Sequence, residues 1–380
     1  MTTSAMLLAG LPGRNLSLYR RIRFDVHDPV VFLEIPGQGS TLIIRDIELQ
    51  RAYKLAKADR CVPPAEFAPD GGLSGDREIA FAQAAAECLR RAGVDRVMTD
   101  RALPMLYAHQ CEAVGIEVLC DPMMGVIERR MKDETEIEHL RTAQAMTESA
   151  IELACTTIAR ATADAQGVLH HEGAELTSER VKAMIDAHLT GRGYDNSAGS
   201  IVASGPPAAD CHFQGAGPIR TGEPVIVDVF PRNKETLYCG DCTRCVVHGD
   251  VPDSVAQMHR VILEAKEKAI DACRLGATGE GVHRVTMGVM EAHGYAMGIH
   301  NEGETHVKMV HGTGHGIGLE VHEPPLLDIG APELVRGDAL TVEPGLYDPA
   351  VGGLRIEDMI VVTDDAPINL NALHEGLAWS

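Results

Sequence analysis

The stretch CGDCTRC, residues 239–245, places three cysteines three positions apart around one aspartate. This spacing could hold a thiolate-bound metal or an iron–sulfur cluster, or the chemistry could lie in Asp241. Side chains of a strand alternate between two faces, so Cys239 and Cys245 would share a face with Asp241, and Cys242 would point the other way. A cluster would also need a loop and a fourth cysteine nearby. We therefore expect packing cysteines and a functional Asp241.

A second aspartate interrupts the apolar run PVIVDVF, residues 224–230. A carboxylate such as Asp228 is costly there unless it is hydrogen-bonded or binds a cation. The next residues, 231–237, are turn formers, so the chain would return as a hairpin with Asp228 opposite Asp241. Two carboxylates ~4 Å apart repel by about 4 kcal/mol at an effective dielectric of ~20, and a bound cation would remove this repulsion. The alternative is an aspartate that caps a turn.

Three histidines lie close together in HGTGHGIGLEVHEPP, residues 311–325. They are His311, His315 and His322. The glycines around them do not fit the register of a dinucleotide-binding loop. They are better explained as positions where the backbone approaches a site closely.

Two glutamates, Glu343 and Glu357, follow in strand-like apolar segments. Oxygen ligands with one imidazole indicate a site for Mn²⁺, Co²⁺, Fe²⁺ or Zn²⁺ and not a site for a metal that prefers thiolates. Two aspartates and two glutamates balance two divalent ions, which is typical of a two-metal hydrolase. The sequence contains neither H-E-x-x-H nor G-x-S-x-G.

The elements that must position these residues fall into two parts. In the first ~125 residues, short strands alternate with helices, which is typical of a small α/β domain. We expect strands at 30–35, 41–46, 95–100 and 116–121, and helices at 77–93 and 102–114. In the second part we expect helices at 134–160, 178–190 and 254–275, the last capped by Asp253 or Ser254, and strands at 199–204, 224–230, 244–248, 339–347 and 355–363. We place the domains at 1–128 and 129–380.

Composition narrows the class of protein. The chain has 380 residues and a formal charge of −21, which argues against nucleic acid or an anionic membrane as partner. No run approaches the roughly 20 apolar residues of a membrane span, and no basic segment precedes the short apolar run near the N-terminus. We expect a cytoplasmic protein whose ten cysteines are free thiols.

The candidate residues resemble a known ligand set. Asp228, Asp241, His315 in GHGIGLEVHE, Glu343 in TVEPG and Glu357 in RIED match, in order, the five metal ligands of the pita-bread metallopeptidases. This family includes Xaa-Pro dipeptidase (prolidase), aminopeptidase P and methionine aminopeptidase. The resemblance covers residues from about 130 to 380 and includes the opening helix. A separate N-terminal domain is similar to those of prolidase and aminopeptidase P. The resemblance as a whole implies an α/β, creatinase-N-like domain followed by an α+β pita-bread (creatinase/aminopeptidase) catalytic domain.

The resemblance also implies roles for the ligands. Asp241 and Glu357 would bridge two metal ions, Asp228 would complete one site, and His315 with Glu343 would complete the other. Glu343 would also be the general base toward the bridging water. The ions would be Mn²⁺ first, with Co²⁺, Zn²⁺ or Fe²⁺ as alternatives.

Further roles concern the substrate. His322 matches a catalytic histidine that contacts the substrate and stabilises the tetrahedral intermediate. His212, in ASGPPAADCHFQG, matches a histidine of the proline-side pocket, and His311 matches a neighbouring one. Arg355 matches an arginine beside the second bridging glutamate, where a structural salt bridge is the competing interpretation.

The implied activity is that of a metallo-exopeptidase. It would hydrolyse the Xaa-Pro bond of small peptides with a hydroxide that bridges the metals, as a dipeptidase or an aminopeptidase, and act as a homodimer. The alternatives are a hydrolase or lyase of this fold for a small non-peptide metabolite, and a non-catalytic binding protein. Two departures from the family pattern stand out. Phe230 replaces a glycine, and the Asp228–Asp241 spacing is two residues longer than usual.

Overall fold

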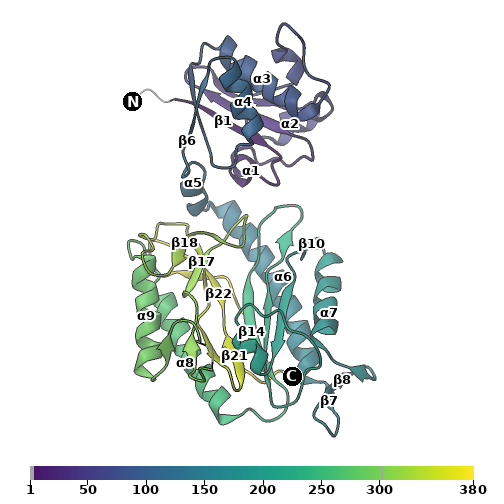
Figure 1. Ribbon diagram of the computed structural model, residues 1–380, viewed down its shortest axis with the longest axis vertical. Helices are drawn as coiled ribbons and strands as arrows, with labels where there is room; N and C mark the ends of the chain where they lie inside the picture. Colours follow the sequence, from purple (N-terminus) through teal and green to yellow (C-terminus); the bar gives the residue numbers. More distant parts are fainter. Residues whose placement is uncertain (1–3, 302) are drawn as a thin grey trace. The chain divides into compact units, whose positions relative to one another are not determined.

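The computed structural model describes residues 4–301 and 303–380, and the chain divides into two units, Met1–Arg129 and Arg130–Ser380 (Figure 1). The first unit holds one six-stranded sheet in the order β4-β3-β2-β1-β5-β6. Its strands are β1 (Ala5–Gly10), β2 (Val30–Ile35), β3 (Gly39–Ile43), β4 (Arg60–Val62), β5 (Arg96–Thr99) and β6 (Glu117–Cys120). Its helices are α1 (Leu16–Ile22), α2 (Leu49–Leu55), α3 (Arg77–Arg91) and α4 (Met105–Ala113), and α5 (Val126–Arg130) follows.

Both faces of this sheet are buried. Leu7 and Leu33 pack with Phe81 of α3 in one cluster, whereas their strand neighbours Leu8 and Phe32 belong to a second cluster. Alternate residues of β1 and β2 therefore serve opposite cores, as the period of two along a strand requires.

The second unit is built from helices and several small sheets. Its helices are α6 (Glu134–Ala159), α7 (Ser178–Thr190), α8 (Asp253–Ala272) and α9 (Gly279–Ala292). Its first strands are β7 (Thr162–Ala163), β8 (Leu169–His171), β9 (Ala174–Glu175), β10 (Tyr194–Asp195), β11 (Ser200–Ser204), β12 (Pro224–Val229), β13 (Arg232–Asn233) and β14 (Cys242–Val247). The later strands are β15 (Ala296–Met297), β16 (Lys308–Met309), β17 (Gly314–Gly316), β18 (Glu323–Leu327), β19 (Ala339–Val342), β20 (Gly345–Asp348), β21 (Gly352–Arg355), β22 (Asp358–Val361) and β23 (Ile368–Asn369).

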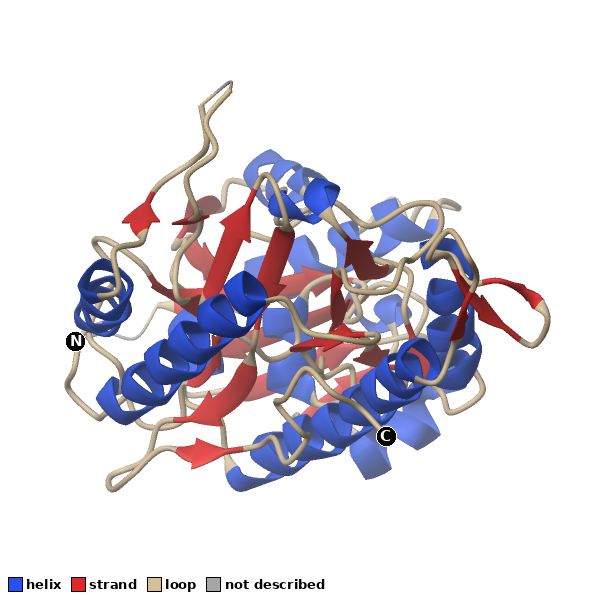
Figure 2. Ribbon diagram, turned by 90° about the horizontal axis from the view of Figure 1, so that it is seen from below, coloured by secondary structure: helices blue, strands red, loops and turns tan. Residues whose placement is uncertain are grey.

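Three sheets of this unit concern the site. Their orders are β11-β12-β14, β15-β16-β20-β21 and β18-β17-β19-β22-β23. Figures 1 and 2 show strands between two helix pairs, with α6 beside α7 and α8 beside α9. The long opening helix α6 carries a full capping box, in which Asp133 and Glu136 satisfy each other's backbone N–H groups.

Most expected elements are present, and the differences have local causes. Helix α9 was not anticipated, although Thr278 caps it and accepts from the N–H of Gly281. The expected cap of α8 was wrong, because Pro252 occupies the N-cap position and no described side chain caps that helix. The expected strand 339–347 is two strands, β19 and β20, which belong to different sheets. All ten cysteines are free, as expected.

Candidate active site

The two aspartates lie on one face of the β12–β14 ladder but not opposite each other. Asp228 pairs with Thr243, and Asp241 precedes the first residue of β14. The expected direct pairing was therefore wrong, because the register places Asp241 one diagonal step along the same face. Both side chains are buried. Diagonal neighbours on one face of a sheet lie roughly 7–8 Å apart, a spacing that leaves room for a cation between two carboxylates.

The longer spacing between the aspartates is absorbed by the hairpin tip. The backbone N–H of Leu237 donates to the Asn233 carbonyl at 2.9 Å, and that of Gly240 donates to Pro231 at 2.9 Å. The Asn233 side-chain oxygen accepts hydrogen bonds from the backbone N–H groups of Glu235 and Thr236. The residues of the long tip thus form a closed turn beyond the ladder, in which Asp228 pairs with Thr243.

The two glutamates occupy a corner shared by two sheets. Glu343 lies between β19 and β20, and Glu357 lies between β21 and β22. The pairs β19–β22 and β20–β21 are antiparallel, with Val342 opposite Asp358 and Gly345 opposite Arg355. One long hairpin therefore passes from one sheet to the other, and both of its arms carry a glutamate at the bend.

His315 reaches the same place from β17. Its Nε2 atom lies 3.4 Å from Glu343 Oε1 and 3.7 Å from Asp241 Oδ2. Its backbone N–H donates to Thr341 Oγ1 at 3.1 Å. A Cβ atom on the preceding residue, Gly314, would lie 2.0 Å from the Thr341 carbonyl oxygen, which explains the glycine beside the histidine.

Charge is crowded among these side chains. Burial raises the pKa of Asp241 well above its usual value, and the Glu357 carboxylate raises it further. Burial likewise raises the pKa of Glu357, with the Glu343 carboxylate next in effect, and burial raises that of Glu343. Burial lowers the pKa of His315, which favours the neutral imidazole that ligates metals. Protons or cations must therefore balance the carboxylates.

The donor set fits divalent metal ions. Ligand atoms of Asp241, His315 and Glu357 lie within 4.8 Å of one another. Asp228 Oδ1 is buried and has no hydrogen-bond partner among the described residues, although its Oδ2 accepts from Arg355 Nη2 at 2.5 Å. An orphaned carboxylate oxygen is costly unless something binds it. Carboxylate oxygens with one imidazole are ligands for a first-row divalent ion.

Arg355 connects the ligands to a histidine. Its Nε donates to Thr243 Oγ1 at 3.2 Å, and its Nη1 donates to Tyr347 Oη at 2.8 Å. Tyr347 Oη lies 2.8 Å from His311 Nε2. The ion pair with Asp228 is the salt bridge that the structural interpretation of Arg355 expects.

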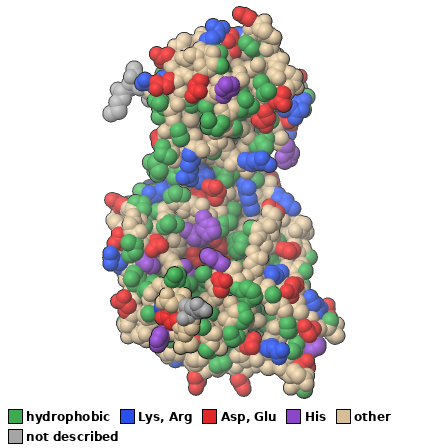
Figure 3. All heavy atoms as spheres, viewed as in Figure 1, with side chains coloured by type: hydrophobic (Ala, Val, Ile, Leu, Met, Phe, Trp, Pro, Cys, Tyr) green, Lys and Arg blue, Asp and Glu red, His purple; other side chains and the backbone are tan. Residues whose placement is uncertain are grey.

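All predicted site residues line one cavity of about 320 Å³. Figure 3 shows histidine side chains gathered beside acidic ones in a hollow of the second unit. His315 and His322 pack with ring centroids 4.3 Å apart. Phe230 and Ile201 contribute apolar wall. The residues are His212, Asp228, Asp241, His311, His315, His322, Glu343, Arg355 and Glu357.

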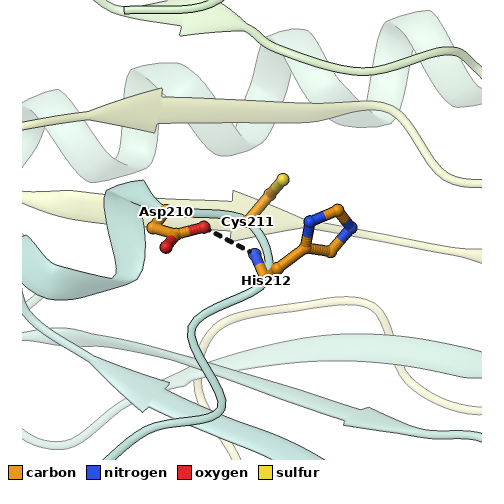
Figure 4. A group of neighbouring side chains, drawn as sticks. All are labelled: Asp210, Cys211 and His212. Atoms are coloured by element: carbon orange, nitrogen blue, oxygen red, sulfur yellow. Dashed lines mark hydrogen bonds between the residues drawn. The ribbon is translucent and has the colours of Figure 1, made fainter.

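A second group of possible ligands, Asp210, Cys211 and His212, follows the short helix at Pro206–Ala209 (Figure 4). The Asp210 carboxylate accepts the backbone N–H of His212 at 3.0 Å. This hydrogen bond closes a turn. Burial raises the pKa of the neighbouring Cys211 thiol. Cys211 and His212 line the main cavity, whereas Asp210 serves the loop that carries them.

Three residues that support the proposed metal ligands were not predicted from the sequence. Thr243 Oγ1 donates to Glu357 Oε2 at 2.8 Å. The Gln144 side chain, on α6, accepts from the Asp241 N–H at 3.0 Å and donates to its carbonyl at 2.7 Å. Arg244, fully buried, donates to the Glu357 carbonyl at 2.6 Å. Arg244 interrupts the apolar run 242–247, and this was the one available signal.

Comparison with known proteins adds the family. The sequence profile of Metallopeptidase family M24 matches residues 138–364, well over half of the chain. The chain belongs to metallopeptidase family M24. Among M24-like relatives, "Probable dipeptidase PepE" of Mycobacterium tuberculosis is 29% identical over 371 residues, 96% of this chain and 90% of that protein. The Xaa-Pro dipeptidase of Pyrococcus horikoshii is 25% identical over 337 residues, 87% of this chain and 84% of that protein.

A solved structure supports the same fold. The X-Pro aminopeptidase of Thermotoga maritima superposes with a TM-score of 0.79 at 22% identity, over 98% of this chain and 96% of that one. The second unit thus has the pita-bread fold, as the resemblance implied, and it follows an α/β unit. Among residues 4–301 and 303–380, no helix is long and apolar enough to cross a membrane.

Proposed function

We propose that this M24 protein hydrolyses the bond between an N-terminal residue and proline in small peptides, using two divalent metal ions. The observation that carries the proposal is the convergence of the predicted ligands and histidines on one cavity. M24 relatives named Xaa-Pro dipeptidase support the substrate class. Manganese is the first ion to test, and a cytoplasmic homodimer is the form we propose.

We assign the ligand roles as follows. Asp241 and Glu357 would hold both ions, Asp228 would complete one site, and His315 with Glu343 would complete the other. Bound there, the ions would lower the pKa of a water molecule and polarise the scissile carbonyl. Arg355 would act through Asp228, because its guanidinium is already bonded to that carboxylate.

The chain's own residues would orient the substrate and move the proton. Glu343 would accept a proton from the attacking water and deliver it to the proline nitrogen as the C–N bond breaks. His322, exposed at the cavity, would donate a hydrogen bond to the developing oxyanion. His212 and His311 would lie on the proline side, where Phe230 offers an apolar wall to the ring.

A metal centre suits this bond for a simple reason. The amide before proline is tertiary and has no N–H to donate. A site that grips the carbonyl oxygen and encloses the ring does not depend on that missing donor.

The decisive experiment combines metal analysis with turnover. Chain reconstituted with Mn²⁺ should bind about two ions and hydrolyse Ala-Pro, Ala-Pro-Ala or both. Asp241→Ala should lose ions and at least about 10²-fold in kcat/KM, which corresponds to about 2.7 kcal/mol. Asp271→Ala, at a side chain 73% exposed on α8, should behave as wild type. Full metal loading without turnover of either peptide would refute the proposal.

A further inference from the structure

The cavity contains a fifth carboxylate that the proposed metal set does not use. Asp328 follows β18 and lines the cavity with its side chain 46% exposed. Its Oδ1 lies 3.5 Å from Nε2 of His283, and it accepts the N–H of Ile329 at 2.7 Å. His283 is buried on α9, and its Nδ1 lies 2.9 Å from Thr313 Oγ1. The Asp328 carboxylate therefore lies beside a buried imidazole and is bonded to the next backbone N–H.

No uncommitted permanent cation faces Asp328 among the described residues that line the cavity. Arg355 is the one lysine or arginine in that lining. Besides its bonds to Thr243, Tyr347 and Asp228, it donates from Nη1 to the Cys211 carbonyl at 3.4 Å. Four of the five N–H donors of a guanidinium are thus occupied by the protein.

This charge distribution matters for the length of the substrate. A dipeptide spans roughly 7 Å at ~3.5 Å per residue, so both of its charged ends must lie in or beside a cavity of about 320 Å³. The four ligand carboxylates already balance the charge of two divalent ions, so a substrate carboxylate placed there has no free cation to pair with, and Asp328 repels it. The nearby His212 and His322 side chains can offer hydrogen bonds from the same cavity.

A longer peptide avoids this problem. Its proline carries a neutral peptide bond instead of a carboxylate, and each further residue moves the C-terminal charge ~3.5 Å outward. We propose that Asp328 is a specificity residue that selects against a free carboxylate on the proline, so that the substrates are N-terminal Xaa-Pro sequences that continue beyond proline. The inference rests on the proposed function and chooses aminopeptidase over dipeptidase.

Three substrates separate charge from length in Mn²⁺-loaded, full-length protein. They are Ala-Pro, Ala-Pro amide and Ala-Pro-Ala. The kcat/KM of the amide and of the tripeptide should each exceed that of Ala-Pro by at least about tenfold, and most of the difference should lie in KM. The amide tests charge, because it adds no residue.

Variants at Asp328 then assign the effect. Asp328→Asn should lower the ratio of kcat/KM for Ala-Pro amide to kcat/KM for Ala-Pro at least threefold, and Asp328→Arg should lower this ratio further. Turnover of Ala-Pro-Ala by each variant is the internal control for folding. Asp271→Asn removes the same charge from a site outside the cavity and should leave the ratio unchanged.

The outcomes also separate the two proposals. Ala-Pro turnover equal to or above that of its amide, or a ratio unchanged in Asp328→Asn, would overturn the role of Asp328 and leave the Xaa-Pro activity standing. Failure of all three substrates with metal bound would overturn both.

Discussion

Lys266 of α8 offers a test of how the glutamate corner is supported. Its side chain is 4% exposed, and its Nζ lies 2.5 Å from Asp358 Oδ2 and 2.5 Å from Glu375 Oε1. Asp358 directly follows the proposed ligand Glu357 and also accepts from Arg244 Nη2 at 2.8 Å. Lys266→Met keeps the length of the side chain and removes one cation from a buried cluster.

The magnitude follows from burial. Removing one partner of a buried ion pair costs about 3–5 kcal/mol, because the other charge stays buried without it. Asp358 retains Arg244, so we expect the lower end, about 3 kcal/mol in the free energy of unfolding. Lys268, on the same helix, pairs with Glu264 but is 53% exposed. Lys268→Met should therefore cost no more than about 1 kcal/mol.

Trp379 gives the assay. It is the only tryptophan in the sequence, and its Nε1 donates to the Cys245 carbonyl on β14 at 3.0 Å. Its fluorescence in urea thus reports unfolding of the second unit. With an m-value of about 3 kcal/mol/M, Lys266→Met should lower the urea midpoint by about 1 M. Measurements in EDTA exclude stabilisation by bound metal. Equal midpoints for Lys266→Met and Lys268→Met would show that the buried cluster does not stabilise the corner.

Three other changes test separate parts of the structure. Thr243→Val removes the hydroxyl bonded to Glu357 and should weaken Mn²⁺ binding in calorimetry by about 10–100-fold, whereas Thr243→Ser should restore it. Gly240→Ala would place a Cβ 2.1 Å from a threonine oxygen of α6, so it should reduce the number of metal ions bound per chain. Gly288→Ala, whose Cβ would have no described atom within 4 Å, should leave that number unchanged, and equal numbers for the two variants would contradict this prediction. Hydrogen bonds from two arginines one turn along α3 lower the pKa of Glu87 to about 2 from 4.5. A lowered pKa contributes stability that is fully present above pH 4.5 and disappears as the pH falls through 2. Hydrogen exchange in α3 should therefore be slower in wild type than in Glu87→Gln at pH 5, and the two exchange rates should converge near pH 2. A difference between the rates that stays constant with pH would refute this.

The candidate ligands could be proposed from the sequence because unusual residues stand out locally. Asp228 in an apolar strand and three histidines within twelve residues each require an explanation beyond core packing. The resemblance of their order and local motifs to the pita-bread metallopeptidases then implied the five proposed ligands, all of which line one cavity. Strands and helices with strong periodicity, such as β2 and α6, were equally predictable.

Geometry between distant segments was not readable. The diagonal relation of Asp228 and Asp241 depends on a ladder register that a long turn could have shifted. The split of 339–347 into two strands depends on which sheets the two halves join, and an apolar sequence gives no sign of that choice.

The sequence by itself determined which side chains could bind metal, because ligand chemistry is a property of single residues and their neighbours in the chain. Tertiary structure alone decided what each of them faces. Arg244 donates to the Glu357 carbonyl across 113 positions, and His283 of α9 lies beside Asp328 at the cavity. Such contacts arise when sheets and helices pack, and their partners are too far apart in the chain for spacing to predict them.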